Sequence, residues 1–119
     1  MKKLLTLESI ALFLGCYGAT LYSGSAWWLY PVWLLAPDLS MIGYAFGPRP
    51  GALTYNLMHH QATGIVVLAL GAVLHQPQLL FAGWVLLGHS AMDRVFGYGL
   101  KYPDAFKHTH LGWIGGQPR

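Results

Sequence analysis

Four long apolar segments run through the chain, and they restrict its possible folds more than any other feature. They cover residues 4–22, 26–46, 51–74 and 78–100, each close to the roughly 20 residues that a helix needs to cross the core of a bilayer. Of the 119 residues, 55% are hydrophobic and only 9% are charged, as is typical of membrane proteins. The sequence predicts one all-α domain, 1–119: a four-helix transmembrane bundle with a short cytoplasmic interfacial segment at the C-terminus, 101–119.

The second apolar segment is the least regular. Pro31 and Pro37 lie inside it, and each proline removes a backbone donor. A kink or break is therefore expected within residues 26–46. In the third segment, Gly64 and Gly71 are two helical turns apart, which predicts a face in close contact with another helix.

The start of the chain could be read as a cleaved signal peptide. However, Glu8 interrupts the apolar stretch, and the stretch continues beyond Cys16, so a retained transmembrane helix is favoured. Cys16 is the only cysteine of the chain and cannot form an internal disulfide. It is predicted to be a packing residue.

The basic residues indicate the orientation of the bundle. They flank the first span, the turn between the second and third spans, and the end of the fourth span, at Lys2, Lys3, Arg49, Lys101, Lys107 and Arg119. The turns at 23–25 and 75–77 contain no Lys or Arg. The positive-inside rule then predicts a multi-pass protein of the cytoplasmic membrane with both termini cytoplasmic. The net charge of +3 is too scattered to indicate a nucleic-acid site.

Polar residues of the four predicted spans fall into one layer. Measured from the cytoplasmic end, Glu8 lies at roughly 6 Å, Asn56 at roughly 8 Å, and Asp38, His59 and Asp93 at roughly 10 to 12 Å. His89 is deeper, at roughly 17 Å. Helical spacing places Asn56, His59 and His60 on one face, and His89 and Asp93 on another. Such residues are expensive inside a membrane unless they have a partner or a function.

A divalent metal ion would explain this layer. Neutral imidazole nitrogens and carboxylate oxygens suit zinc, iron or manganese, and the charge of the metal would offset the buried carboxylates. The predicted ligands are Asp38, His59, His89 and Asp93. A purely structural network is the alternative, in which Asp38 caps a helix after Pro37 and Asp93 pairs with Arg94 or with the Asn56 amide.

The C-terminal tail adds two more histidines. Residues 97–104 are rich in helix-breaking and turn-forming residues and are expected to end the fourth helix. An interfacial segment, 105–114, would be anchored by Phe106 and Trp113 and would place His108 and His110 beneath the bundle. These histidines are interpreted either as ligands or as a simple polar face. Residues 27–30 are interpreted as an aromatic belt, and His75 is not assigned to the site.

Three motifs stand out in the chain: residues 36–41, residues 55–59, and the long run from His89 through 93–94 and 97–102 to 106–107 and 109–112. They resemble the DUF4260 family of small bacterial integral membrane proteins, whose function is undefined. The resemblance covers almost the whole chain and implies a bacterial inner-membrane location. His60 and His108 are not typical of the family pattern, which favours Asp38, His59, His89, Asp93 and His110 as the functional residues.

The first functional hypothesis is a metal-dependent hydrolase acting on a lipid or small amphiphile. Some of the four ligands would hold the metal beside a bound water, and a remaining carboxylate would act as general base. The predicted catalytic residues are Asp38, Arg94 and His110, and Arg94 or Lys101 would bind an anionic headgroup. The sequence leaves open whether the protein is an enzyme.

The alternative is a non-enzymatic module that binds or transports an ion, a proton or a small ligand. A homo-oligomer is expected in that case, because four helices are few for a transporter. A haem held by His59 and His89 is disfavoured by the two neighbouring carboxylates. A structural or partner-binding role, in which the polar groups set the helix register, is a third interpretation.

Overall fold

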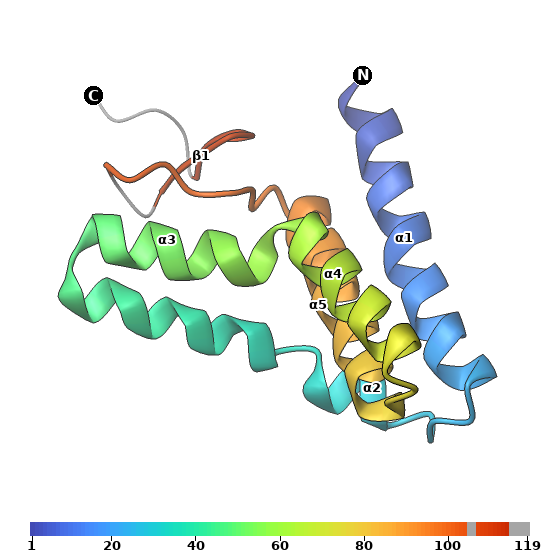
Figure 1. Cartoon of the computed structure of the whole chain (residues 1–119). Coiled ribbons are helices and arrows are strands. Elements are labelled where there is room, and N and C mark those ends of the chain that lie inside the picture. Colours follow the sequence, from blue (N-terminus) through green and yellow to red (C-terminus); the bar gives the residue numbers. More distant parts are fainter. Residues whose placement is uncertain (105–106, 115–119) are drawn as a thin grey trace.

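The computed structural model describes residues 1–104 and 107–114, and these are mostly helical (Figure 1). The elements in chain order are α1 (Lys2–Tyr22), α2 (Leu29–Trp33), the 3-10 helix η1 (Ala36–Phe46), α3 (Pro48–His59), α4 (Gln61–Val73), α5 (Pro77–Val95), and the short strands β1 (His108–Thr109) and β2 (Gly112–Trp113). The prediction of an all-α fold is confirmed. The two strands form one small antiparallel hairpin after α5.

Helix α5 is central, because both α4 and α1 pack against it. The helices η1 and α3 lie against each other and project sideways from this three-helix bundle (Figure 1). The start of α1 and the end of α5 are at the same end of the bundle, and α2 is at the other end (Figure 1). The candidate site lies at the junction between the η1–α3 pair and α5.

The predicted break in the second apolar segment is confirmed. Helix α2 ends at Trp33, and Pro37 occupies the first turn of η1. The same segment does not form one membrane-spanning helix, since its second half is a 3-10 helix lying against α3.

The prediction of one continuous helix over 51–74 is wrong. Helix α3 ends at His59, His60 is extended (φ −74°, ψ 130°), and α4 begins at Gln61. Tertiary and capping bonds satisfy the backbone groups freed by the break. The Ser90 hydroxyl donates to the His59 carbonyl at 2.7 Å, and the His60 ring accepts from the Ala62 N–H at 3.0 Å. Within the described residues one helix, α1, is long and apolar enough to cross a membrane, and α4 is a shorter apolar helix.

Glycines let α4 and α5 approach closely, as predicted for Gly64 and Gly71. A Cβ atom added at Gly64 would lie 2.8 Å from the Leu87 side chain, and one at Gly71 would lie 2.7 Å from the Leu80 backbone nitrogen. Gly83 on α5 has the same role against Leu68 of α4. The two backbones could not pack this closely with larger residues at these positions.

Replacing Gly71 by alanine should therefore destabilise the protein by about 1–3 kcal/mol, because the added methyl group meets backbone atoms that cannot rotate away. Gly15→Ala is the matched control, since Gly15 is also helical but has nothing within 4 Å of the new Cβ atom. The control variant should be more stable than the wild type by up to about 1 kcal/mol, because alanine has a higher helix propensity than glycine. Thermal unfolding in detergent measures both changes, and similar losses in the two variants would contradict the close α4–α5 contact.

The interior of the bundle lies between α1, α2 and α5. Cys16 is buried there with Tyr30, Val85 and Leu87, which confirms its predicted packing role. The Tyr30 hydroxyl donates to the Phe13 carbonyl at 3.1 Å. Tyr30 is therefore a core residue and not part of an aromatic belt, whereas Trp27 and Trp28 are exposed.

Candidate metal centre

Four ionisable side chains meet where three elements join. Asp38 comes from the first turn of η1, His59 is the last residue of α3, and His89 and Asp93 lie one turn apart on α5. Their ligand atoms all lie within 4.8 Å of one another. The four residues predicted as metal ligands are thus brought together, and we call this group the His/Asp centre.

The backbone determines which nitrogen of each imidazole carries a proton. His59 Nδ1 is 2.8 Å from the Tyr55 carbonyl oxygen, and His89 Nδ1 contacts the Leu34 carbonyl oxygen. Because a carbonyl oxygen can only accept, both Nδ1 atoms must donate, so the Nε2 atom of each neutral ring presents a lone pair. Both Nε2 atoms point into the His/Asp centre, where the 2.9 Å contact of His89 Nε2 with Asp38 Oδ1 is a hydrogen bond when that ring carries a second proton.

The environment of His59 Nε2 is the most informative detail of the centre. This atom is buried and has no hydrogen-bond partner among the residues that the structure describes, yet it lies 3.3 Å from Asp93 Oδ2 and 3.4 Å from Asp38 Oδ1. A lone pair facing two carboxylates is repulsive unless a cation or a proton lies between them. Two carboxylates and two neutral imidazoles carry a net charge of −2, which one divalent cation would neutralise.

The dimensions of the centre suit a small divalent metal. Ligand bonds of about 2.0–2.2 Å in a tetrahedral site place the ligand atoms about 3.4 Å apart. Besides the two His59 contacts, His89 Nε2 lies 2.9 Å from Asp38 Oδ1 and 3.5 Å from Asp93 Oδ1. Three of these distances, 3.3–3.5 Å, are close to that edge, whereas the 2.9 Å from His89 Nε2 to Asp38 Oδ1 is a hydrogen-bond length; Asp93 faces His59 through Oδ2 and His89 through Oδ1. The His89–Asp93 pair confirms the expected i, i+4 placement on one helix face.

Neighbouring side chains hold the ligands in place. The Tyr55 hydroxyl donates to Asp93 Oδ2 at 2.7 Å, and the Tyr55 ring stacks on His59 with centroids 3.8 Å apart. Ser90 holds the carbonyl of His59. The sequence interpretation did not assign roles to Tyr55 and Ser90, although Tyr55 lies one turn before His59 and Ser90 follows His89 directly. Such outer contacts orient metal ligands.

One ligand differs from the others in exposure. The side chains of His89, His59 and Asp93 are 0%, 3% and 13% exposed, whereas that of Asp38 is 40% exposed. No side-chain capping bond is made at the start of η1, so Asp38 does not act as the helix cap considered above. The His/Asp centre is therefore closed on the α3 and α5 sides and accessible on the η1 side.

The C-terminal segment docks next to the centre through Asn56. The Asn56 amide donates to the Lys101 carbonyl at 2.7 Å and accepts from the Lys101 N–H at 2.6 Å. Lys101 is buried, and its ammonium lies 4.8 Å from the centroid of the Tyr55 ring. Asn56 thus anchors the tail and does not enter the His/Asp centre.

Two residues of the predicted polar layer lie elsewhere. Glu8 is exposed on α1 and does not belong to the centre, so the expectation that all four segments contribute is wrong and three elements contribute. His60 is exposed and caps α4, because the helix ends before it. The prediction that His60 shares a face with His59 is therefore also wrong.

Arg94 and His110, the other two residues predicted to be catalytic, meet outside the centre. His110 Nδ1 accepts from the Leu100 N–H at 2.8 Å, and burial together with the charge of Arg94 lowers the pKa of His110. In residues 1–104 and 107–114, Arg94 makes no ion pair with Asp93. Their catalytic roles stay predictions.

His108 forms a small cluster of its own. Its Nδ1 atom lies 2.9 Å from the Asp104 carboxylate, and its ring stacks against Tyr102 and Trp113. This arrangement favours the polar-face interpretation over a ligand role. Of the predicted interfacial segment, 105–106 lie outside the described residues, and His108–Trp113 form the β1–β2 hairpin. His75 lies in the turn between α4 and α5, at the opposite end of α5 from Asp93.

Comparison with known proteins identifies a family but no activity. Residues 2–114 match the DUF4260 family, described as a domain of unknown function. No curated protein and no solved structure shows a significant match. Since the match extends over nearly the whole chain, the protein belongs to the DUF4260 family.

Proposed function

We propose that the protein is a membrane protein whose His/Asp centre binds one divalent cation, either zinc, iron or manganese. The observation that supports this most directly is the buried His59 Nε2 atom, which faces two carboxylates and has no hydrogen-bond partner within residues 1–104 and 107–114. The contacts of both Nδ1 atoms with backbone carbonyls support the same proposal, as does the placement of the four ligand atoms within 4.8 Å of one another. A purely structural ion-pair network would instead need a proton on this atom, and therefore a buried imidazolium.

We further propose that the metal supports hydrolysis of a lipid or small amphiphile. His59, His89 and Asp93 are the resident ligands, because they are the least exposed. When bound, the metal supplies a polarised water molecule at its open position. Asp38 would act as general base toward such a water, because its carboxylate is both within the centre and the most exposed of the four side chains.

The proposed location is the bacterial inner membrane, with α1, α4 and α5 in the bilayer and both termini cytoplasmic. Three observations support it. Helix α1 is long and apolar enough to cross a membrane. The start of α1 and the end of α5 lie at the same end of the bundle (Figure 1), and basic residues lie near both. The η1–α3 pair exposes further large apolar side chains, which would contact lipid: Leu39, Ile42, Phe46, Leu53 and Leu57.

Elemental analysis tests the proposal. Untagged protein purified in mild detergent without chelator should contain about one equivalent of zinc, iron or manganese. Asp38→Asn should retain at least about half of the metal, because three ligands suffice for a catalytic site, and should lose hydrolytic activity. Wild-type protein that binds none of these metals after reconstitution would contradict the proposal. Rapidly exchanging metal and active transport would support the ion-transport alternative instead.

A further inference from the structure

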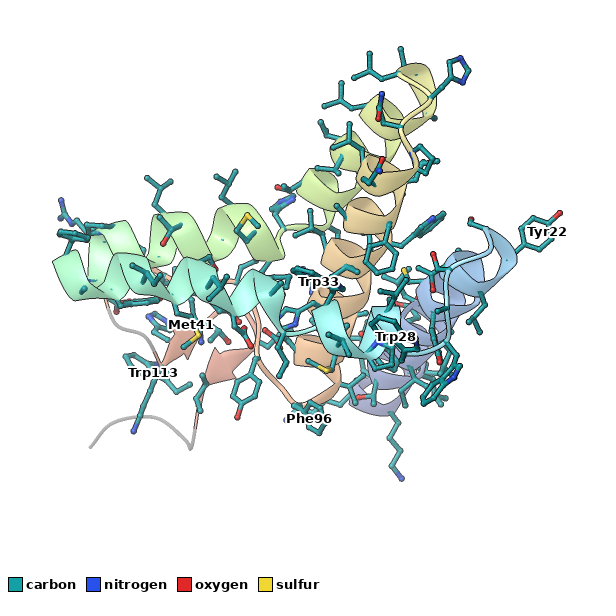
Figure 2. All side chains as sticks on the ribbon, turned by 90° about the horizontal axis from the view of Figure 1, so that it is seen from below. Tyr22, Trp28, Trp33, Met41, Phe96 and Trp113 are labelled. Carbon is teal, nitrogen blue, oxygen red and sulfur yellow. The ribbon has the colours of Figure 1, made fainter. Side chains whose placement is uncertain are left out.

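An apolar groove with a volume of about 670 Å³ runs beside the His/Asp centre. Its walls come from α2, the start of η1, the end of α3 and the first half of α5, and include Trp33, Pro37, Met58, Phe81, Val85 and Leu86. Trp33 lies where the α2–η1 segment crosses α5 (Figure 2). By contrast, side chains such as Tyr22 and Phe96 project away from the bundle (Figure 2).

One end of the groove adjoins the His/Asp centre. Pro37 precedes Asp38 and Met58 precedes His59 in the sequence, and Leu86 lies three residues before His89 on α5. The other end contains two polar lining residues, Ser25 and Gln78. Between Gln78 and Leu86 the groove follows α5 for about 12 Å.

We infer that this groove binds one acyl chain of the substrate, with the polar head of the same molecule at the His/Asp centre. The inference rests on the proposed function and specifies the substrate as an amphiphile with at least one acyl chain. The middle of the groove has only apolar walls, so a polar ligand would lose hydrogen bonds there. An acyl chain loses none and gains from burial.

The size of the groove suits an acyl chain. Its volume lies within the range of about 300–1,000 Å³ typical of small-molecule sites. The end of the groove beside the His/Asp centre would hold the start of the chain. The bond to be cleaved, between the chain and the head, would then lie next to the ligands.

A photoreactive lysophospholipid tests the inference. The probe carries a palmitoyl chain with a diazirine near its end and is added to detergent-purified, metal-loaded protein. Mass spectrometry should locate crosslinks at the far end of the groove, near Ser25 and Gln78. An unlabelled palmitoyl lysophospholipid should compete, whereas a hexanoyl analogue should not, because its chain would not fill the groove.

Ala82→Trp provides the matching variant, because Ala82 lines the groove and is half-buried on α5. The indole should fill the space and reduce crosslinking at least about tenfold, while the His/Asp centre and its metal content stay intact. Ala69→Trp on the exposed face of α4 is the control and should crosslink as the wild type does. Folding is checked by thermal unfolding, and the competition experiment on the wild type does not depend on either variant.

Two outcomes would overturn the inference. Crosslinks spread evenly over exposed apolar residues of α4, such as Ile65 and Val66, would show ordinary surrounding lipid. Equal competition by the palmitoyl and hexanoyl analogues would show that no chain enters the groove. Metal analysis distinguishes this failure from failure of the proposed function. Crosslinks in the groove of a protein that binds no metal would support the chain-binding site and contradict the metal centre.

Discussion

Alanine at His59 or His89 should lower the metal content from about one equivalent to less than about a tenth, because each variant removes one of the three resident ligands. Both imidazoles are held by backbone carbonyls, so their Nε2 atoms are already oriented toward the centre. Inductively coupled plasma mass spectrometry on the purified variants measures the change. Activity, once a substrate is known, should fall with the metal.

Two other histidines serve as controls for this experiment. His60→Ala changes the residue next to His59, but His60 is exposed and caps α4. His75→Ala changes a histidine in the α4–α5 turn. Both variants should keep the metal content of the wild type. Equal metal content in all four variants would contradict the proposed centre, and equal loss in all four would indicate adventitious binding to histidine.

Asp93→Asn should abolish metal binding while the fold is retained. The amide keeps the size of the side chain and can still accept the hydrogen bond from Tyr55, but it replaces an anionic oxygen ligand by a weaker neutral one and removes charge that would offset the cation. Because a hydrogen bond to a charged acceptor is stronger than one to a neutral acceptor, we expect a loss of about 1–2 kcal/mol in unfolding free energy. Metal analysis and thermal unfolding on the same preparation measure both effects.

The two roles considered for Asp93 predict different results in this experiment. A pure ion-pair role toward Arg94 would predict a destabilisation of about 3–5 kcal/mol with no change in metal content. The structure favours the ligand role, since Asp93 contacts His59 and His89. Asp104→Asn is the control carboxylate, because Asp104 pairs with His108 outside the centre, and it should leave the metal content unchanged. Metal binding that survives Asp93→Asn would exclude Asp93 as a ligand.

Site residues could be predicted from the sequence when they lie on the same helix, because helical periodicity then determines whether they share a face. His89 and Asp93 share a face because a helix rotates by a constant angle per residue, and this needs no knowledge of the rest of the fold. The same holds for the contact face formed by Gly64 and Gly71. The break near Pro37 follows from the chemistry of proline alone. Family membership also followed from the sequence, because the C-terminal motif is long.

Tertiary contacts decided the features that periodicity could not. The break at His60 depends on the bond from Ser90 to the His59 carbonyl, across 31 residues of chain, so the apolar pattern of 51–74 indicated one helix where two exist. Glu8 matched the depth of the polar layer, but depth along an axis does not determine the direction in which a side chain points.

The sequence by itself determined the helical class of the protein, its family and the four residues of the His/Asp centre. Only the tertiary structure decided that the η1–α3 pair projects sideways and meets α5 at the centre. The physical reason is the separation of the partners along the chain. Asp38 reaches His89 across 51 residues, and the Leu34 carbonyl reaches it across 55. Local propensity does not act over such separations, so packing of the whole chain is needed to bring these groups together.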